Sequence, residues 1–272
     1  MLQPFANSHK IDTPMSNGAY SSHELHNAMS DQQFSLFDLD PIDPSTPVAT
    51  PATPAVPSNF DPAAIPTAAS IPIPRGTYHS MAAMKAHCDQ CQRCDLGSTR
   101  THAVVSRGNP EAILMIIGEG PGENEDLTGQ PFVGKAGQLL DKILESVRLT
   151  EEDVFICNIV KCRPPGNRKP SQDEMDACRP YLMEQIRLVD PKLILLAGAS
   201  AVQGLLGDKT GITKLRGQWR EWEGRLCMPV FHPSYLLRNQ SKAQGSPKWL
   251  MWQDIQTVRS KFDELKQTIA DF

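Results

Sequence analysis

The sequence predicts an α/β fold, a three-layer α/β/α sandwich built around a mainly parallel four-stranded central sheet. Short apolar runs rich in Ile, Val and Leu alternate along the chain with longer segments whose apolar residues recur at helical spacing. The apolar runs are bounded by glycine or polar residues, which is typical of buried parallel strands. Strands that alternate with helices in this way favour parallel pairing, with helices on both faces of the sheet.

The first half of the pattern covers residues 113–160. Residues 113–117 form an apolar run that ends at Gly118, and residues 134–147 carry apolar side chains at helical spacing. Residues 154–160 give the second strand. Ser171, with Glu174 three positions later, predicts the start of the next helix, because this pair forms a capping box.

The second half repeats the alternation. Residues 193–197 predict a third strand, followed by a helix that ends near Gly207. Residues 219–222 and 225–231 flank a two-residue turn and predict a hairpin, whose second arm supplies the fourth strand of the sheet. Residues 247–269 close the chain as a helix.

Residues 1–80 predict a disordered, acidic, proline-rich tail, so the domain is expected to span residues 81–272. Twelve of the 23 prolines fall in this tail. It lacks the apolar surface needed to offset an ordering cost of roughly 1–2 kcal/mol per residue. Residues 41–74 should form an extended, semi-rigid linker.

Charge and cysteine usage limit the classes of function. The formal net charge is −4, and the acidic excess lies in the tail, so any nucleic-acid surface must be a local patch. The start of the chain lacks the basic and apolar regions of a signal peptide. Seven cysteines are therefore expected in a reducing cytoplasm, where clustered thiols bind metal more often than they pair.

Four cysteines form the most informative pattern. Cys91 and Cys94 make a C-x-x-C pair, whereas Cys162 follows a predicted strand and Cys178 lies in the next predicted helix. Four thiolates from three places in the chain can converge on one centre. Sulfur ligands favour zinc or an iron–sulfur cluster, and the spacing alone leaves both open.

Three unusual segments follow the predicted strands, at the edge where open parallel sheets bind their ligands. They are residues 118–134, residues 158–165 and residues 231–238. Each has a plain structural explanation by itself: a tight glycine turn, a capping Asn158 and a loop His232. The glycine-rich segment fits neither the dinucleotide pattern nor the P-loop pattern. The combination of all three with the four cysteines predicts a functional site.

These strings closely resemble the family 4 uracil-DNA glycosylases, and the resemblance covers about residues 88–265. The strings, in chain order, are Cys91-x-x-Cys94-x-Leu96-x-x-x-Arg100, Gly118-Glu119-Gly120-Pro121-Gly122, Gly129-Gln-Pro131-Phe132-Val133-Gly134-x-Ala136-Gly137, Asn158-x-x-Lys161-Cys162-Arg163-Pro164-Pro165-x-Asn167-Arg168 and His232-Pro233-Ser234. The resemblance implies one 4Fe–4S cluster, held by Cys91, Cys94, Cys162 and Cys178. The long tail and Cys88 depart from the family pattern, and Cys88 leaves open which two N-terminal thiols bind iron.

The resemblance also implies that the protein removes uracil from DNA during base-excision repair and leaves an abasic site. The implied uracil-binding residues are Gly118, Glu119, Gly120, Glu125, Phe132, Asn158 and His232. Among them His232, Glu119 and Glu125 have implied catalytic roles. An amide at Asn158 matches the N3–H donor and O4 acceptor of uracil but opposes cytosine, and Phe132 offers a stacking face. Glu125 is expected to exclude the thymine methyl group or to order water.

Contacts to DNA are expected from basic and apolar side chains around the same edge. These are Arg163, Arg168, Lys169 and Arg238, which would meet phosphates, and Leu236 or Leu237, which would enter the space left by the extruded base. Solvated surface charges are the alternative for the basic residues. No lysine is placed as an amine nucleophile, so a monofunctional enzyme is expected.

The tail contains one apolar island, Gln33-Phe34-Ser35-Leu36-Phe37. It is similar to the pentapeptide with which bacterial repair proteins bind the sliding clamp, although an island this short can arise by chance. A cytoplasmic protein associated with the bacterial nucleoid is therefore expected. Two rival functions are a uracil-trapping relative that stays bonded to DNA and a non-catalytic interaction protein. The direct run of residues 134–140 into a helix opposes the first rival, because those relatives carry an extra loop there.

Overall fold

The computed structural model describes residues 69–270, which fold around a single six-stranded sheet. The strands are β1 (Arg107–Gly108), β2 (Leu114–Gly118), β3 (Val154–Asn158), β4 (Leu193–Ala197), β5 (Arg220–Trp222) and β6 (Arg225–Val230). Their order is β1-β3-β2-β4-β6-β5. The four central strands run parallel, whereas β1 and β5 pair antiparallel at the two edges.

The prediction of a mainly parallel sheet is confirmed, but the predicted count of four strands is wrong. The four predicted strands are the four central, parallel ones. Both additional strands are short edge strands. β5 is the first arm of the predicted hairpin, whereas β1 was not predicted. An edge strand needs fewer buried side chains than a central one, so the two residues of β1 carry little signal in the sequence.

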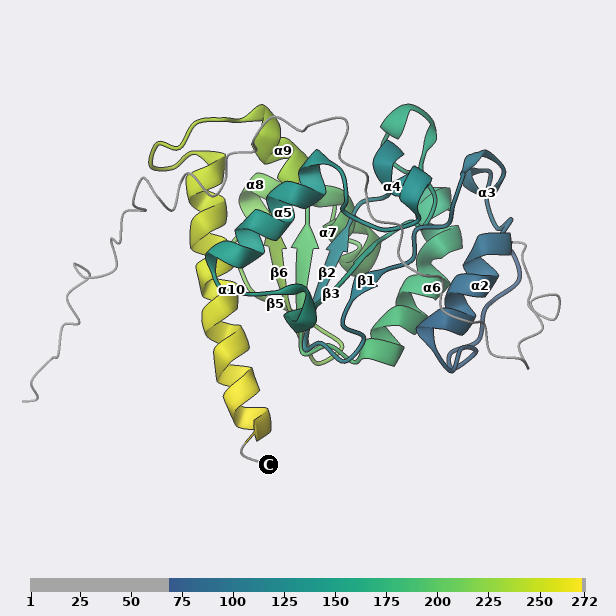
Figure 1. The fold of residues 1–272 in the computed structure, drawn as a ribbon, viewed down its shortest axis with the longest axis horizontal. Coiled ribbons are helices and arrows are strands. Elements are labelled where there is room, and N and C mark those ends of the chain that lie inside the picture. Colours follow the sequence, from purple (N-terminus) through teal and green to yellow (C-terminus); the bar gives the residue numbers. More distant parts are fainter. Residues whose placement is uncertain (1–68, 271–272) are drawn as a thin grey trace, which may run out of the picture.

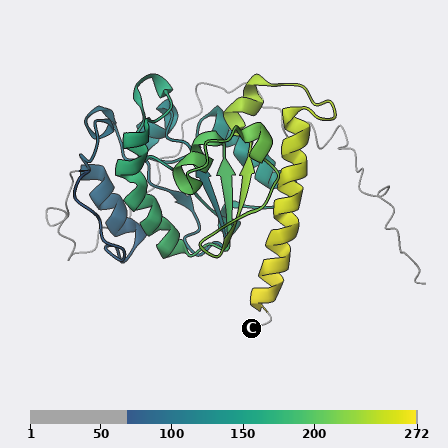
Figure 2. The same cartoon turned by 180° about the vertical axis from the view of Figure 1, so that it is seen from behind.

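Helices cover both faces of the sheet (Figures 1 and 2). The helices are α2 (Met81–Gln90), α3 (Leu96–Thr99), α4 (Glu123–Thr128), α5 (Lys135–Ser146), α6 (Gln172–Val189), α7 (Ala199–Leu206), α8 (Ile212–Leu215), α9 (Pro233–Arg238) and α10 (Pro247–Ala270). Helices α2, α6 and α7 pack with Met115 and Ile117 on one face. Helices α5 and α10 pack with Leu114 and Ile116 on the other face. This division follows from the alternation of side chains along a strand.

The folded part of the protein begins before residue 81, which corrects the predicted domain boundary. Residues 69–80 lie against α6, with Tyr78 buried and the buried Glu184 accepting hydrogen bonds from the amides of Gly76 (2.8 Å) and Tyr78 (3.2 Å). The side chain of Arg93 binds the carbonyl of Ala69 at 3.0 Å. Composition suggested disorder here because the stabilising partners lie far away in the sequence. The rest of the predicted tail, including the pentapeptide at 33–37, lies outside the described residues.

The carboxyl ends of the parallel strands meet at the edge of the sheet where α4 and α9 lie (Figure 1). β2 and β3 are in register so that Gly118 pairs with Asn158. The segments that follow the two strands therefore start side by side. Within residues 69–270, no helix is long and apolar enough to cross a membrane.

Candidate active site and metal centre

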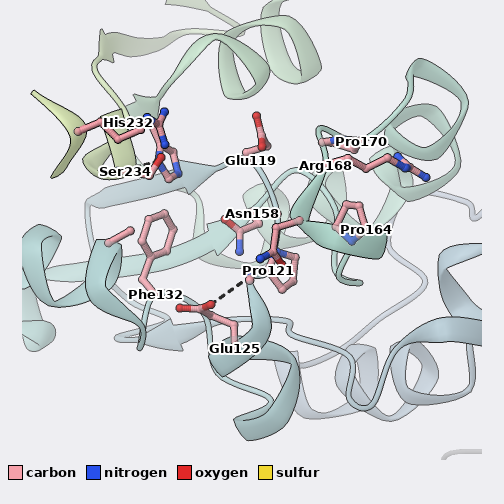
Figure 3. A pocket seen from close by; sticks show the side chains of 15 residues that line it. Glu119, Pro121, Glu125, Phe132, Asn158, Pro164, Arg168, Pro170, His232 and Ser234 are labelled. Atoms are coloured by element: carbon pink, nitrogen blue, oxygen red, sulfur yellow. Dashed lines mark hydrogen bonds between the residues drawn. The ribbon is translucent and has the colours of Figure 1, made fainter. Parts of the chain in front are cut away.

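A cavity of about 340 Å³ lies at this edge of the sheet (Figure 3). It is lined by Glu119, Gly120, Pro121, Gly122, Glu125, Phe132, Ala136, Asn158, Pro164, Asn167, Arg168, Pro170, His232, Ser234 and Arg238. Three segments far apart in the sequence thus contribute to one cavity, as the sequence predicted. Of the predicted uracil-binding residues, Gly118 does not line the cavity but lies directly behind it.

Asn158 presents a hydrogen-bond acceptor that has no partner. The residue ends β3 and is only 2% exposed, and its Oδ1 atom is buried without a hydrogen bond to any described residue. An unsatisfied buried acceptor costs about 1–3 kcal/mol, so such an atom usually has a functional reason. The amide of Asn158 faces the cavity near Phe132 (Figure 3). It is ready to receive a donor from a bound molecule.

Gly118 allows the two walls of the cavity to approach each other. A Cβ atom on Gly118 would lie 2.5 Å from Cζ of Phe132 and would also collide with Oδ1 of Asn158. Only a residue without a side chain fits at the end of β2. The glycine of the first motif therefore serves the geometry of the aromatic ring and the amide.

Phe132 forms the aromatic wall and has a strained backbone. Its φ angle is +56°, in the left-handed region that non-glycine residues rarely adopt. Gly137 permits this conformation, because any Cβ at position 137 would collide with the carbonyl group of Phe132. Arg107 holds the same turn by donating to the carbonyls of Pro131 (3.0 Å) and Phe132 (3.4 Å). The ring lies 5.9 Å from the imidazole of His232, at an interplanar angle of 30°.

His232 caps α9 with its own side chain, and this bond fixes its tautomer. The backbone N–H of Ser234 donates to Nδ1 of His232 at 3.2 Å. Because a backbone amide can only donate, Nδ1 carries no proton and Nε2 carries one. Burial lowers the pKa of His232 to about 4, and the charge of Arg238 contributes to the shift. At neutral pH the side chain is therefore an uncharged imidazole whose free group is a donor.

The two carboxylates of the cavity have different surroundings. Glu119 accepts a hydrogen bond from the hydroxyl of Ser200, at the start of α7. Glu125 accepts the amides of Gly122 (3.1 Å), Val133 (2.9 Å) and Gly134 (2.7 Å). Its carboxylate thus closes the loop that carries Phe132. This bonding makes Glu125 a structural support of the cavity wall as well as a lining residue, a role that the sequence did not reveal.

A second cavity collects the thiols between α2, α3 and α6. It is lined by Cys88, Cys91, Cys94, Cys162 and Cys178, together with Arg93, Gly97, Arg100, Lys161, Ala177 and Tyr181. The four predicted metal ligands therefore come together, and Cys88 joins them. Arg100 donates to the carbonyl of Cys91 at 2.7 Å and to Sγ of Cys162 at 3.4 Å. Soft thiol donors around a buried space fit an iron–sulfur cluster.

The thiols are not gathered around a single point. Within the part of the chain that the structure describes, no three Cys, His, Asp or Glu side chains are grouped closely enough to hold one metal ion. A zinc ion with Zn–S bonds of about 2.3 Å would draw its sulfurs to roughly 3.8 Å from one another. The five thiols instead line one small cavity.

Comparisons with known proteins place the chain in a family. Residues 105–256 match the family model of the uracil DNA glycosylase superfamily. The chain is 44% identical over 173 residues to the type-4 uracil-DNA glycosylase of Thermotoga maritima, covering 63% of this chain and 88% of that protein. It is 41% identical over 169 residues to the type-4 enzyme of Sulfurisphaera tokodaii, covering 59% and 77%. The chain belongs to the type-4 uracil-DNA glycosylases.

In this glycosylase the basic residues around the cavity are not equivalent. The guanidinium of Arg168 forms a paired ionic contact with Glu174, at 2.8 and 2.6 Å, and points away from Asn158 (Figure 3). It stabilises the start of α6. Arg163 bonds to Asn167 at 2.7 Å. Lys169 and Arg238 are exposed, as Arg168 is, and Arg238 lines the cavity.

The glycosylase cannot use Leu236 to enter DNA in this conformation, which corrects the sequence-based expectation. Leu236 is 0% exposed and belongs to the hydrophobic core beneath α9. Leu237 is only partly buried and remains the candidate of the two. The sequence could not separate adjacent leucines, because α9 is too short for a helical period to show which one faces inward.

Several contacts in the glycosylase escaped the sequence analysis altogether. These are the bond from Ser200 to Glu119, the support of Phe132 by Gly137 and the burial of Lys161 beside the cysteines. Gly137 and Lys161 belong to the sequence strings that resemble the family, but the sequence analysis assigned no role to either residue. Ser200 stands outside every string.

Proposed function

We propose that the cavity at the strand ends binds uracil extruded from DNA and that the protein hydrolyses its N-glycosidic bond, which releases uracil and leaves an abasic site. The observation that carries this proposal is the unpartnered Oδ1 of Asn158, buried near an aromatic ring and an imidazole. Membership of the uracil-DNA glycosylases supports the same activity in DNA repair.

Recognition follows from the hydrogen-bonding pattern of the base. In a base stacked on Phe132, the N3–H of uracil donates to Oδ1 of Asn158 and O4 accepts from Nδ2. Cytosine offers an acceptor at N3 and a donor at N4. Its N3 would then face the acceptor Oδ1 of Asn158, and its N4 amino group would face the donor Nδ2, so neither hydrogen bond could form. Mismatched buried groups of this kind discriminate strongly, because the polar atoms of the site are left unpaired.

Catalysis depends on the charge that leaves with the base. Cleavage places negative charge on O2 of uracil, and Nε2–H of His232 is free to donate to it. An uncharged donor in a buried site stabilises this charge mainly in the transition state. Glu119, held by Ser200, and the backbone at Gly120 complete the wall around the base. Glu125 restricts the space beside C5 by fixing its loop.

The reaction is expected to end at the abasic site. In the described part of the chain no lysine lines the cavity, so no amine is placed to attack the sugar. Arg163, Lys169 and Arg238 are proposed to contact phosphates, with Arg168 holding their loop. Leu237 is proposed to occupy the gap left by the base. Such phosphate contacts make binding dependent on salt but independent of sequence.

We assign the second cavity to one 4Fe–4S cluster with Cys91, Cys94, Cys162 and Cys178 as ligands. Cys88 lines the same cavity and is the third N-terminal thiol beside Cys91 and Cys94. When bound, the cluster supplies a structural cross-link between the start of the domain and α6. The thiols and their neighbours hold it, and none of the steps at the base depends on its redox chemistry.

The segment before the domain is proposed to recruit the enzyme to DNA synthesis. Gln33, Phe34, Ser35, Leu36 and Phe37 would bind the bacterial sliding clamp. This would place the enzyme at the nucleoid in the cytoplasm. A peptide spanning residues 31–40 should bind the clamp in a titration, and a peptide with alanine at both phenylalanines should not. Equal behaviour of the two peptides would remove the recruitment role.

The activity is tested with a uracil-containing oligonucleotide and iron-replete protein. The expected product is an abasic site, detected by alkaline strand cleavage. Asn158→Asp should reduce excision of uracil and shift the preference towards cytosine. Asn109→Asp is the matched control, since Asn109 follows β1, away from the cavity, and bonds to the carbonyl of Glu152. Absence of abasic product from the unchanged protein would reject the proposed function.

A further inference from the structure

Lys161 links the cavity of the cysteines to Asn158, which lines the cavity at the strand ends. Its side chain is only 1% exposed and lines the cavity of the cysteines. Its Nζ atom donates a hydrogen bond to the main-chain carbonyl of Asn158, three residues earlier. The turn between them is anchored by the amide of Val104, which donates to the carbonyl of Lys161 at 2.8 Å. One side chain therefore touches both the metal centre and the residue that presents the free amide to the base.

The burial of Lys161 calls for a negative partner. An ammonium group has three donors, and among the described residues one of them is bonded to Asn158. A buried charge is costly unless a charged or polar partner compensates it. The thiolates of a bound cluster would supply this partner, since four thiolates outweigh the charge of the iron–sulfur core. Arg100 contributes a second cation through its contact with Cys162.

Building on the cluster and the uracil site proposed above, we propose that Lys161 is a positioning residue that couples them. It balances the negative charge of the cluster and holds the backbone of Asn158 at the end of β3. Removal of the cluster would release the ammonium group from its partner and loosen its bond to Asn158. Loss of the cluster should therefore reduce the discrimination between uracil and cytosine, although the cluster takes no part in the reaction.

Two substitutions separate the two functions of the side chain. Lys161→Gln removes the charge but keeps a donor for the carbonyl of Asn158, whereas Lys161→Met removes both. A nearby cation favours the reduced, more negative cluster, so both variants should shift its midpoint potential to more negative values. Lys161→Met should in addition lower kcat/KM on uracil by about tenfold, which is the effect of losing one buried hydrogen bond. Lys161→Gln should lower kcat/KM on uracil by a smaller factor.

Two further variants serve as controls. Lys209→Met removes an exposed lysine that lines neither cavity. It should change neither the midpoint potential nor kcat/KM on uracil. Arg100→Gln removes a second cation from the cavity of the cysteines and should shift the potential, with a smaller loss of discrimination between uracil and cytosine than Lys161→Met causes. Iron content and the visible absorbance of each variant show whether the cluster is retained, and the melting temperature shows whether the chain is folded.

The coupling is overturned if Lys161→Gln and Lys161→Met leave the potential at the wild-type value, or if both bases are processed with wild-type discrimination by Lys161→Met. It is also overturned if Arg100→Gln reduces discrimination as much as Lys161→Met does, because the effect would then reflect the cluster in general. Failure of the proposed activity is a separate result: the unchanged protein would make no abasic product, while the potentials would still test the charge balance.

Discussion

Gly118 offers the most direct test of the cavity geometry. In Gly118→Ala, the new Cβ would lie 2.5 Å from Cζ of Phe132 and would overlap Oδ1 of Asn158, whereas ordinary contacts begin near 3.4 Å. The ring and the amide must therefore retreat by about 0.9 Å. A misplacement of about 1 Å in a positioning group can reduce a rate about 100-fold, equivalent to about 2.7 kcal/mol in the activation free energy.

The assay is single-turnover excision of uracil at saturating enzyme, which reports the chemical step on bound DNA. Overpacking also destabilises a fold by about 1–3 kcal/mol, so unfolding is measured in parallel to ensure that only folded protein is compared. The matched control is Gly211→Ala, since a Cβ at Gly211 meets no atom closer than 4.0 Å. A rate for Gly118→Ala within threefold of the control would refute the proposed packing of Phe132 against Asn158.

Three further predictions concern separate features. The pKa of His232 is about 4 in the folded protein, against 6.5 for an unperturbed histidine. The free energy of unfolding should therefore fall as the pH drops from 6.5 towards 4, because the unfolded chain takes up a proton that the folded site does not. Chemical denaturation of His232→Gln should show a change in the free energy of unfolding across this pH range that is smaller than in the unchanged protein by up to about 3 kcal/mol. Ser200→Ala should free Glu119 and lower kcat about tenfold with little change in KM, and an unchanged kcat would show that this bond has no catalytic effect. Cys178→Ser should abolish the thiolate-to-iron absorbance, whereas Cys227→Ser, in the core and outside the metal cavity, should retain it; equal spectra would contradict the ligand assignment.

Central elements of the fold were predictable because burial on both sides leaves a clear sequence pattern. β2 and β4 are apolar along almost their whole length, and α5 shows helical spacing. β1 was not predictable, because two residues at an edge contain no period. The packing of residues 69–80 was also missed, since it depends on Glu184, which stands more than 100 residues later.

The candidate site was predictable mainly because its motifs resemble those of a known family. An amide reader, an imidazole and four thiols have few plain alternatives when they occur together, and the structure brings them into two cavities. Relations between side chains were less accessible. Only the three-dimensional arrangement shows that Arg168 is paired with Glu174 and that Leu236 is buried.

The segment 69–80 has a practical consequence for anyone who shortens this chain. Arg93, beside the thiols, binds the carbonyls of Ala69 and Ile71, while Tyr78 bonds to His87 on α2. A truncated protein that starts at residue 81 would lack these partners at the wall of the proposed metal site, which would leave the thiols more open to oxygen and chelators. Expression of the catalytic part alone should therefore begin no later than Ala69, even though the pattern of prolines suggests a later start.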